Sequence, residues 1–267
     1  MAKNAIRDLW QQGKTVINGW SVIPSSWSAE ILANAGYDSV TLDLQHGMIH
    51  YDSAVPMLQA ISTTSAVPMA RVPWNEPGII MKMLDAGCLG IICPMVNTRQ
   101  ECEKFVGACR YFNDGGYRSY GPVRANVYVG SDYFQRASQE VLTFAMIETA
   151  QAVENIDSIL SVPGLDAVYV GPADLSITYD GRPTSDYEGR ADLLAKLDII
   201  VAACRRHKIA AGIHAASLAH AQRMEMRGFN FITMLSDGAY LSAAVKRDVT
   251  AMRNRAEDSA VDSRSPY

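Results

Sequence analysis

The chain has 267 residues, of which 48% are hydrophobic and 19% are charged, so it is long enough to form one large domain with a substantial core. The formal net charge of −4 gives no basic field, which argues against nucleic acid or an anionic membrane as the main partner. There is no apolar leader, no run of about 18 apolar residues, and no C-x-x-C pair among the five cysteines. We therefore expect a cytoplasmic protein with reduced cysteines that acts on a small molecule.

Short runs of β-branched and apolar residues recur along the chain, and each is followed by a polar turn and a helical pattern. The predicted strands cover residues 16–22, 39–44, 67–72, 90–93, 142–147, 167–171, 209–213 and 230–235. Eight strands that alternate with helices in a chain of this length predict an α/β fold, the (β/α)8 or TIM barrel. The alternative is a doubly wound open sheet, because a strand count from one sequence can err by about one or two.

Two stretches depart from this alternation. The segment 111–138 mixes tyrosine, glycine, arginine and asparagine without a period, and we interpret it as a long loop that covers the substrate. Residues 238–254 carry one more helical pattern, and residues 255–267 form a polar tail that we expect to be flexible. The prediction is a single barrel domain over residues 1–254 with an extra C-terminal helix.

In a barrel of this kind the active site lies at the C-terminal ends of the strands. The residues expected there are Trp20, Asp43, Gln45, His46, Arg71, Pro94, Glu148, Gly171, Pro172, Ala173, Asp174, His214 and Asp237. They include a cation, a candidate base and several acids, which together indicate a catalytic site.

Two of these acids, Glu148 and Asp174, follow different strands. Carboxylates are hard oxygen donors, and a pair that leaves several coordination positions open is typical of a magnesium or manganese site rather than a closed zinc site. The alternative is structural, because Glu148 could favour the start of the following helix and Asp174 could cap a turn.

His46 lies across a turn from Asp43, so a carboxylate could orient its imidazole as a general base near neutral pH. A purely structural hydrogen-bonding role is the alternative. The spacing of four between His46 and His50 also suggests a helical metal pair, but the intervening Gly47, directly after a strand, argues against a regular helix there.

Arg71 lies within an otherwise apolar strand, where an unpaired charge would be costly, so it is expected to be paired or functional. Directed at the same mouth as a metal, it would stabilise a developing oxyanion. Asp85, near a helix end, is ambiguous. The sequence contains no G-x-S-x-G elbow, no phosphate-binding loop and no lysine at a predicted strand end, which leaves metal-assisted carbon acid chemistry.

Five motifs in consistent order resemble the HpcH/HpaI (4-hydroxy-2-oxoheptanedioate aldolase) family of metal-dependent pyruvate aldolases. They are residues 43–47 (DLQHG), 70–75 (ARVPWN), 84–96 (LDAGCLGIICPMV), 147–156 (IETAQAVENI) and 170–176 (VGPADLS). The resemblance implies a class II aldolase that joins pyruvate or hydroxypyruvate to an aldehyde, or cleaves the adduct, through an enolate of the 2-oxo acid.

The resemblance also implies roles for individual residues. Glu148 and Asp174 would hold a divalent Mg, Mn or Co ion that a 2-oxo acid chelates. Arg71 would donate to the keto oxygen, and the backbone amides around Ala173 and Asp174 would receive the substrate carboxylate. The other residues expected to bind the substrate are Gly171 and Pro172 of the same turn, Trp20, Gln45, Arg124 and His214.

His46 would be the base, with Asp43 and Asp85 as orienting acids. Such relatives form hexamers, as trimers of dimers, whose C-terminal helices exchange between subunits, so the resemblance implies that residues 238–254 are exchanged.

Some positions depart from the family pattern. Gln45 stands where many members have glutamate, and Met146 where some have glutamine. Segment 111–138, including Arg124, departs most, and we expect it to face the aldehyde. His214 either lines this acceptor pocket or is a partly buried surface histidine. Two other functions stay open, an acyl-CoA lyase of the malyl or citramalyl type and a non-catalytic 2-oxo acid binding protein.

Overall fold

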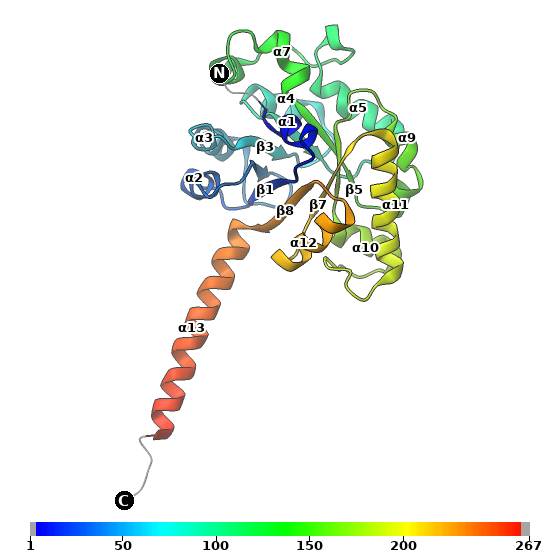
Figure 1. Ribbon diagram of the computed structural model, residues 1–267. Helices are drawn as coiled ribbons and strands as arrows, with labels where there is room; N and C mark the ends of the chain where they lie inside the picture. The colour runs from blue at the N-terminus through cyan, green and yellow to red at the C-terminus, as the bar shows by residue number, and fades with distance from the viewer. Residues whose placement is uncertain (1–3, 263–267) are drawn as a thin grey trace, which may run out of the picture.

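The computed structural model describes the backbone of residues 4–262 and the side chains of residues 4–254. Its centre is a closed barrel of eight parallel strands in sequential order (Figure 1). The strands are β1 Val16–Ser21, β2 Ser39–Asp43, β3 Val67–Arg71, β4 Gly90–Cys93, β5 Leu142–Ile147, β6 Ala167–Val170, β7 Ala210–His214 and β8 Phe231–Ser236. The predicted barrel is confirmed, and every predicted strand boundary lies within one residue of the observed one.

Helices cover the outside of the barrel and connect its strands. The α-helices that surround it are α1 Ile6–Gln11, α2 Ser26–Asn34, α3 Tyr51–Ile61, α4 Pro77–Asp85, α5 Arg99–Cys109, α6 Val123–Tyr128, α7 Tyr133–Glu140, α8 Ala150–Glu154, α9 Ile156–Leu160, α10 Pro172–Asp180, α11 Ala191–His207 and α12 Leu218–Arg227. Local signals set several starts. Thr98 and Glu101 form a reciprocal capping box at α5, and Pro172 occupies the first turn of α10, where its missing N–H costs nothing.

The interior of the barrel is a packed core at its N-terminal half. The rings of Phe144 and Phe231 lie 4.7 Å apart between centroids, and Tyr169 adds an edge contact to Phe231 at 6.2 Å. Close approach is possible at Gly90, where a Cβ would come within 2.6 Å of the Met69 side chain. This filled interior is typical of a TIM barrel and leaves only the strand ends for chemistry.

The two ends of the barrel carry different elements. The N-terminal ends of the strands face α1, α6 and α7, whereas the C-terminal ends face the start of the last helix (Figure 1). The prediction of a substrate-covering loop over residues 111–138 is therefore wrong. The segment contains a short 3-10 helix at Phe112–Asp114 followed by α6 and most of α7, and it follows α5, which has returned the chain to the N-terminal end.

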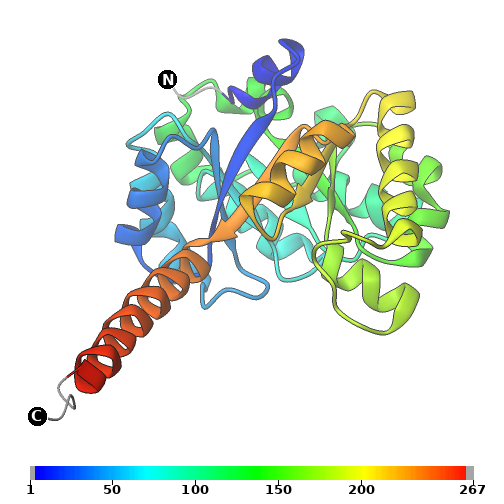
Figure 2. The same cartoon turned by 60° about the horizontal axis from the view of Figure 1, so that its bottom comes forward.

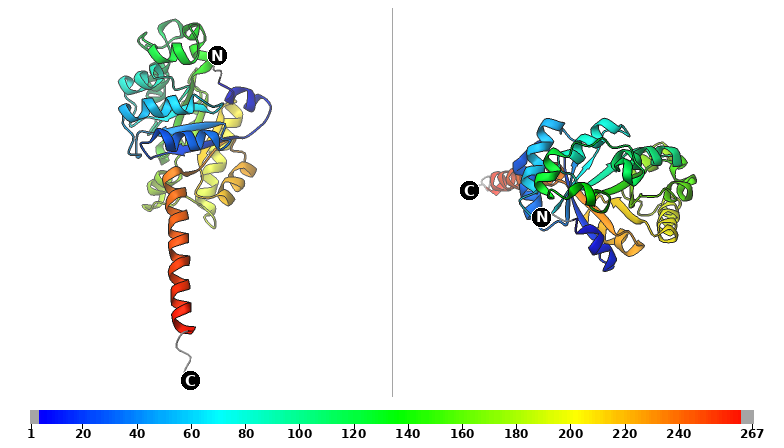
Figure 3. Two further views of the ribbon diagram at one scale, coloured as in Figure 1. Left: turned by 90° about the vertical axis from the view of Figure 1, so that its left-hand side faces the viewer. Right: turned by 90° about the horizontal axis from the view of Figure 1, so that it is seen from above.

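The last helix, α13 Asp237–Asp262, projects away from the barrel (Figures 1 and 3). The helix predicted over residues 238–254 is present, and it continues through part of the segment expected to be a flexible tail. Residues 263–267 of that expected tail lie outside the described residues. Within residues 4–262, no helix is long and apolar enough to cross a membrane.

Candidate active site

A cavity of about 200 Å³ lies at the C-terminal ends of the strands, the end that Figure 2 turns toward the reader. Its lining residues are His46, Arg71, Met146, Tyr169, Gly171, Pro172, Ala173, Asp174, Ser185 and His214. Seven of these ten were expected from the sequence, and these seven end or follow four different strands, β2, β3, β6 and β7. The barrel topology therefore brings together residues that are up to 168 positions apart in the chain.

Arg71 and Asp43 form a buried ion pair at the ends of β3 and β2. The two residues are direct register partners, so the guanidinium reaches the carboxylate with Nε at 2.9 Å from Oδ1 and Nη2 at 2.6 Å from Oδ2. Trp20 adds an indole N–H to Oδ2 at 3.2 Å, and its ring lies 4.9 Å from the guanidinium. Nη1 of Arg71 has no hydrogen-bond partner among the described residues, so it is free for a ligand.

Asp43 is ionised in this arrangement. Burial alone would raise its pKa, but the hydrogen bonds and charge of Arg71 and the amides of His46 and Gln45 hold that pKa below its usual value. Those amides donate to Oδ1 at 3.2 Å and 3.1 Å. Asp43 thus orients the turn that carries His46 rather than the imidazole itself. Gly47 is required in this turn, because a Cβ there would lie 2.3 Å from the Asp43 carbonyl oxygen.

Several polar residues that follow the strands do not line the cavity. Gln45 is half-buried, and its Oε1 has no hydrogen-bond partner in the described structure. His50 is exposed and precedes α3, away from the cavity lining. Asp237 anchors the base of α13, since its carboxylate accepts hydrogen bonds from the hydroxyls of Ser21 and Ser28.

The structure does not bring Asp85 or Arg124 to the cavity within one chain, which corrects two expectations. Asp85 ends α4, and a helix that follows a strand returns to the opposite end of the barrel, so Asp85 cannot orient His46 of the same chain. It pairs instead with Arg118 at 2.7 Å. Arg124 donates to the carbonyl oxygen of Ala86 and to the hydroxyl of Ser62, at the same N-terminal end.

Glu148 is almost fully buried at the end of β5. Its Oε1 accepts the backbone N–H of Met95 at 2.7 Å, while Oε2 faces Gly171, where a Cβ would come within 2.7 Å. Burial and the charge of Asp174 raise the pKa of Glu148 to about 7, and the Met95 amide and Arg71 oppose this rise only in part. Met95 was not expected from the sequence. Its left-handed backbone, with φ of 55°, directs the N–H at the carboxylate.

Asp174 lies in the first turn of α10, which begins directly after β6 with Gly171 as its N-cap. Its carboxylate is exposed toward the cavity. The first backbone N–H groups of a helix have no partner inside the helix, and the helix dipole favours an anion at this end. The amides of Ala173 and Asp174 are therefore suited to a carboxylate group.

The pair Glu148 and Asp174 fits a divalent cation. A buried carboxylate with a raised pKa and one oxygen that no protein group donates to is stabilised by a nearby positive charge. Gly171 leaves the space that this oxygen needs. The described residues contain no cluster of three or more His, Cys, Asp or Glu side chains, so two carboxylates would leave most coordination positions to water or substrate, as Mg²⁺ prefers.

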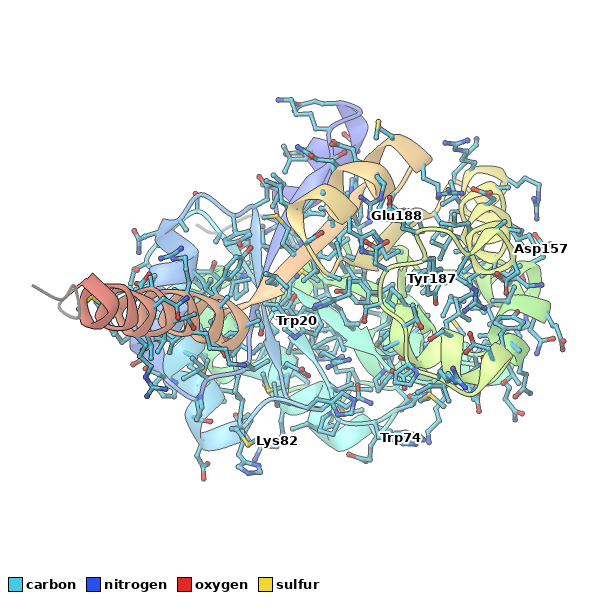
Figure 4. All side chains as sticks on the ribbon, turned by 90° about the horizontal axis from the view of Figure 1, so that it is seen from below. Trp20, Trp74, Lys82, Asp157, Tyr187 and Glu188 are labelled. Carbon is cyan, nitrogen blue, oxygen red and sulfur yellow. The ribbon has the colours of Figure 1, made fainter. Side chains whose placement is uncertain are left out.

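An aromatic group closes the β1, β6 and β7 side of the cavity. Trp20, near the centre of the mouth in Figure 4, stacks on Tyr169 with centroids 5.7 Å apart, and His214 meets the same indole edge-on at 5.2 Å. Tyr169 Oη lies 3.1 Å from Nδ1 of His214. Burial, together with the charge of Arg71, lowers the pKa of His214 to about 4, so its imidazole is neutral at physiological pH.

The loop that borders the cavity is residues 181–190, between α10 and α11. It contributes Ser185 to the lining, and the Tyr187 hydroxyl donates to the carbonyl oxygen of Pro172. Asp186 holds the loop to α12 through Arg223. Figure 4 shows Tyr187 and Glu188 beside the mouth. Sequence reasoning missed this loop, because its Gly, Pro, Ser and Asp content is ordinary turn composition.

The structure is a (β/α)8 barrel in which Arg71, Asp174 and the start of α10 line one small cavity, with the buried Glu148 carboxylate close by. The family model for HpcH/HpaI aldolase/citrate lyase matches residues 20–244. The chain belongs to this family, which confirms the resemblance seen in the motifs.

Individual relatives agree with this assignment. The chain is 39% identical over 250 residues to a hydroxypyruvate/pyruvate aldolase of Rhizorhabdus wittichii, covering 94% of this chain and 99% of the relative. It is 33% identical over 253 residues to a 4-hydroxy-2-oxo-heptane-1,7-dioate aldolase of Salmonella dublin, covering 91% and 94%. The crystal structure of a family protein from Burkholderia cenocepacia J2315 superposes with a TM-score of 0.86 at 27% identity, covering 94% and 99%.

Proposed function

We propose that the protein is a metal-dependent aldolase that catalyses reversible addition of pyruvate or hydroxypyruvate to an aldehyde. The observation that carries this proposal is Arg71, which two hydrogen bonds to Asp43 hold in the cavity that Asp174 also lines, and whose charge acts on the Glu148 carboxylate. Relatives named as aldolases, which match more than 90% of this chain, support the same chemistry.

In this mechanism Glu148 and Asp174 hold an Mg, Mn or Co ion, which supplies Lewis-acid stabilisation of negative charge when bound. The amides of Ala173 and Asp174 receive the substrate carboxylate at the start of α10. Arg71 donates to the keto oxygen through Nη1 and stabilises the charge that develops there.

His46 accepts a proton from C3 of the 2-oxo acid, and the electrons of that C–H bond move toward the keto oxygen to give an enolate. The enolate carbon then forms the new bond to the aldehyde carbon as the electrons of its C=O bond move to the oxygen. The resulting alkoxide takes up a proton from water, and protonated His46 returns its proton to water. In the reverse direction a 4-hydroxy-2-oxo acid gives a 2-oxo acid and an aldehyde. Asp43 contributes by fixing both Arg71 and the turn that carries His46.

We also propose that the protein is a homo-oligomer, a hexamer built as a trimer of dimers. Supporting this, α13 exposes Leu241, Val245, Val249 and Met252 on one face, at a spacing that repeats with the helix turn. A second copy of the chain would cover this stripe. Light scattering after gel filtration tests it, because a Val245→Asp variant should then lower the measured mass of the assembly.

The five cysteines support a cytoplasmic location, which we propose as well. All five are buried and free, and burial raises the pKa of the thiols of Cys102, Cys109 and Cys204 to about 12, so they act as packing residues.

The acyl-CoA lyase alternative has less support in the site. A nucleotide-sized ligand needs cations for its phosphates at the mouth. Arg118 and Arg124, two arginines of segment 111–138, lie at the N-terminal end with their own partners.

Retro-aldol turnover of 4-hydroxy-2-oxo acids, coupled to detection of pyruvate, tests the proposed function. We expect cleavage that stops with a chelator and returns when Mg²⁺, Mn²⁺ or Co²⁺ is added. Activity that metal removal leaves unchanged would contradict the mechanism, and binding of pyruvate without any turnover would favour a non-catalytic binding protein.

A further inference from the structure

A chain of buried polar side chains crosses the barrel interior beneath the cavity. Oδ1 of Asn18 accepts hydrogen bonds from the hydroxyls of Ser39 at 2.7 Å and Thr41 at 3.0 Å, and Nδ2 donates to Oγ1 of Thr233 at 2.9 Å. All four residues are fully buried. Because two hydroxyl donors occupy the amide oxygen, the Asn18 amide has one orientation, and the Thr233 hydroxyl oxygen accepts a hydrogen bond from its N–H.

Tyr169 continues this chain to the cavity. The register places Tyr169 opposite Gly212 and places Thr233 opposite His214, two residues further along β7. Gly212 is needed beneath the imidazole, since a Cβ there would lie 3.0 Å from the Tyr169 ring. Burial raises the pKa of the Tyr169 phenol, and a hydrogen bond with Thr233 opposes this rise only in part. The phenol therefore keeps its proton at neutral pH, and Nδ1 of His214, 3.1 Å away, is placed to accept a hydrogen bond from it.

A hydrogen bond from the Tyr169 phenol fixes the tautomer of His214. A neutral imidazole has one N–H, and when Nδ1 accepts from a phenol the proton resides on Nε2. Burial keeps the ring neutral by lowering its pKa to about 4. Trp20 contacts both His214 and Tyr169, which restricts the rotation of the two rings. The imidazole lines the same cavity as Arg71 and Asp174, from the β7 side.

Building on the function proposed above, we propose that His214 is the residue that recognises the aldehyde, through a hydrogen bond from Nε2–H to the aldehyde oxygen. That oxygen gains negative charge as the carbon–carbon bond forms, so the hydrogen bond strengthens toward the transition state. The neutral imidazole is a weak acid and keeps its proton, and the step involves no proton transfer from His214. Arg71 acts on the 2-oxo acid and His214 on its partner, while Tyr169 is a positioning residue.

Two measurements distinguish a residue that acts on the aldehyde from residues that act on the 2-oxo acid. Exchange of the pyruvate methyl protons in deuterated water requires enolisation but no aldehyde, whereas cleavage of 4-hydroxy-2-oxopentanoate, the adduct of pyruvate and acetaldehyde, requires both. We expect His214→Phe to lower kcat for cleavage about 100-fold and to change the exchange rate less than about threefold. His214→Gln, which restores an N–H donor, should recover about tenfold of the loss. His207→Phe, on the outer helix α11, serves as the matched control.

Equal losses of cleavage and exchange in His214→Phe would overturn the proposal, because His214 would then act on the 2-oxo acid or on the fold. A wild-type protein with neither reaction would instead overturn the proposed function itself, and the role of His214 with it. The two failures are therefore distinguishable from the same set of measurements.

The tautomer is a second, independent readout that a merely structural role would not move. In protein labelled with ¹⁵N-histidine, we expect the His214 ring of the wild type to show a protonated Nε2 and an unprotonated Nδ1 in NMR spectra. Tyr169→Phe retains the ring packing but removes the phenol, so it should give a mixture of tautomers and a lower kcat for cleavage with unchanged proton exchange. A proton on Nδ1 in the wild type would overturn the proposal.

Discussion

The two ends of the barrel both hold buried arginine–carboxylate pairs, and they differ in what each pair leaves free. At the N-terminal end, Arg110 donates to two backbone carbonyl oxygens and to Asp166 at 3.1 Å. At the C-terminal end, Arg71 places two nitrogens on Asp43 and keeps Nη1 without a partner in the described structure. Both terminal nitrogens of Arg110 are bonded to the protein and hold the fold, whereas one terminal nitrogen of Arg71 stays available beside the cavity.

The larger of the two cavities lies at the N-terminal end, opposite to the candidate active site. The N-terminal end carries a hollow of about 680 Å³ that Arg7, Arg110 and Asp166 line, against about 200 Å³ at the candidate site. The polar groups of the larger hollow already satisfy one another, since Arg7 also pairs with Asp166 at 2.7 Å. Of these two hollows, the smaller one is therefore indicated as the active site by the available Nη1 of Arg71 and by the nearby Glu148, whose pKa burial raises to about 7, and not by its volume.

The largest effect is expected for Arg71→Lys. The lysine retains the charge but loses the fork that serves Asp43 and the substrate together, so kcat/KM for retro-aldol cleavage should fall about 100- to 1000-fold. Circular dichroism should show an unchanged fold. Turnover within threefold of the wild type would show that Arg71 has no role in the mechanism. The Arg71 and Arg110 pairs would then not differ in catalytic function.

The next effect is a pH dependence of stability from His214. Its pKa in the folded protein, about 4, lies below its ordinary value of 6.5, so the unfolded chain binds the proton first as the pH falls. The stabilisation is complete above pH 6.5 and is lost as the pH falls through about 4, a change of about 3 kcal/mol. Urea unfolding of the wild type and of His214→Gln measures it, and parallel pH curves for the two proteins would contradict it.

At the other end, Arg110→Lys should change stability rather than activity. The lysine cannot reach both carbonyl oxygens and Asp166, so buried acceptors lose their donor and the free energy of unfolding should fall by about 2 kcal/mol. The value of kcat should stay the same. A loss of kcat in the folded variant would show that the N-terminal end takes part in catalysis.

The smallest effect on stability is expected for an ion pair on the exposed surface. Arg99 and Glu103 on α5 are each about half-exposed, at 48% and 49%, and solvent screens their attraction. Glu103→Ala should change the free energy of unfolding by less than about 0.5 kcal/mol and leave kcat unaffected. A shift in the unfolding midpoint as large as that of Arg110→Lys would mean that burial is not what separates these ion pairs.

The strands and the rim residues could be predicted because their signals are local. A short β-branched run with polar flanks marks a strand, and the barrel topology then places residues such as Arg71 and Glu148 at one end. The sequence could not show the partner of Tyr169, since His214 lies 45 residues away and a strand tyrosine looks like any core residue. The left-handed backbone of Met95 likewise has no signature in the residue itself.

The prediction for residues 111–138 failed for a related reason. Helices α6 and α7 have six and eight residues, too few turns to show a clear period. Aromatic and basic residues there pack against one another, as Arg118 does between Tyr111 and Tyr133. Asp85 was misplaced because a motif does not reveal at which end of a barrel a helix terminates.

Proton exchange at the methyl group of pyruvate, followed by ¹H NMR in deuterated water without any aldehyde, tests the central claim most directly. We expect the wild-type protein with Mg²⁺ or Mn²⁺ to exchange these protons, and Arg71→Lys or a chelator to slow the exchange about 100-fold or more. No exchange above the buffer rate, or exchange that neither treatment alters, would contradict an enolate stabilised at the Arg71, Glu148 and Asp174 end of the barrel.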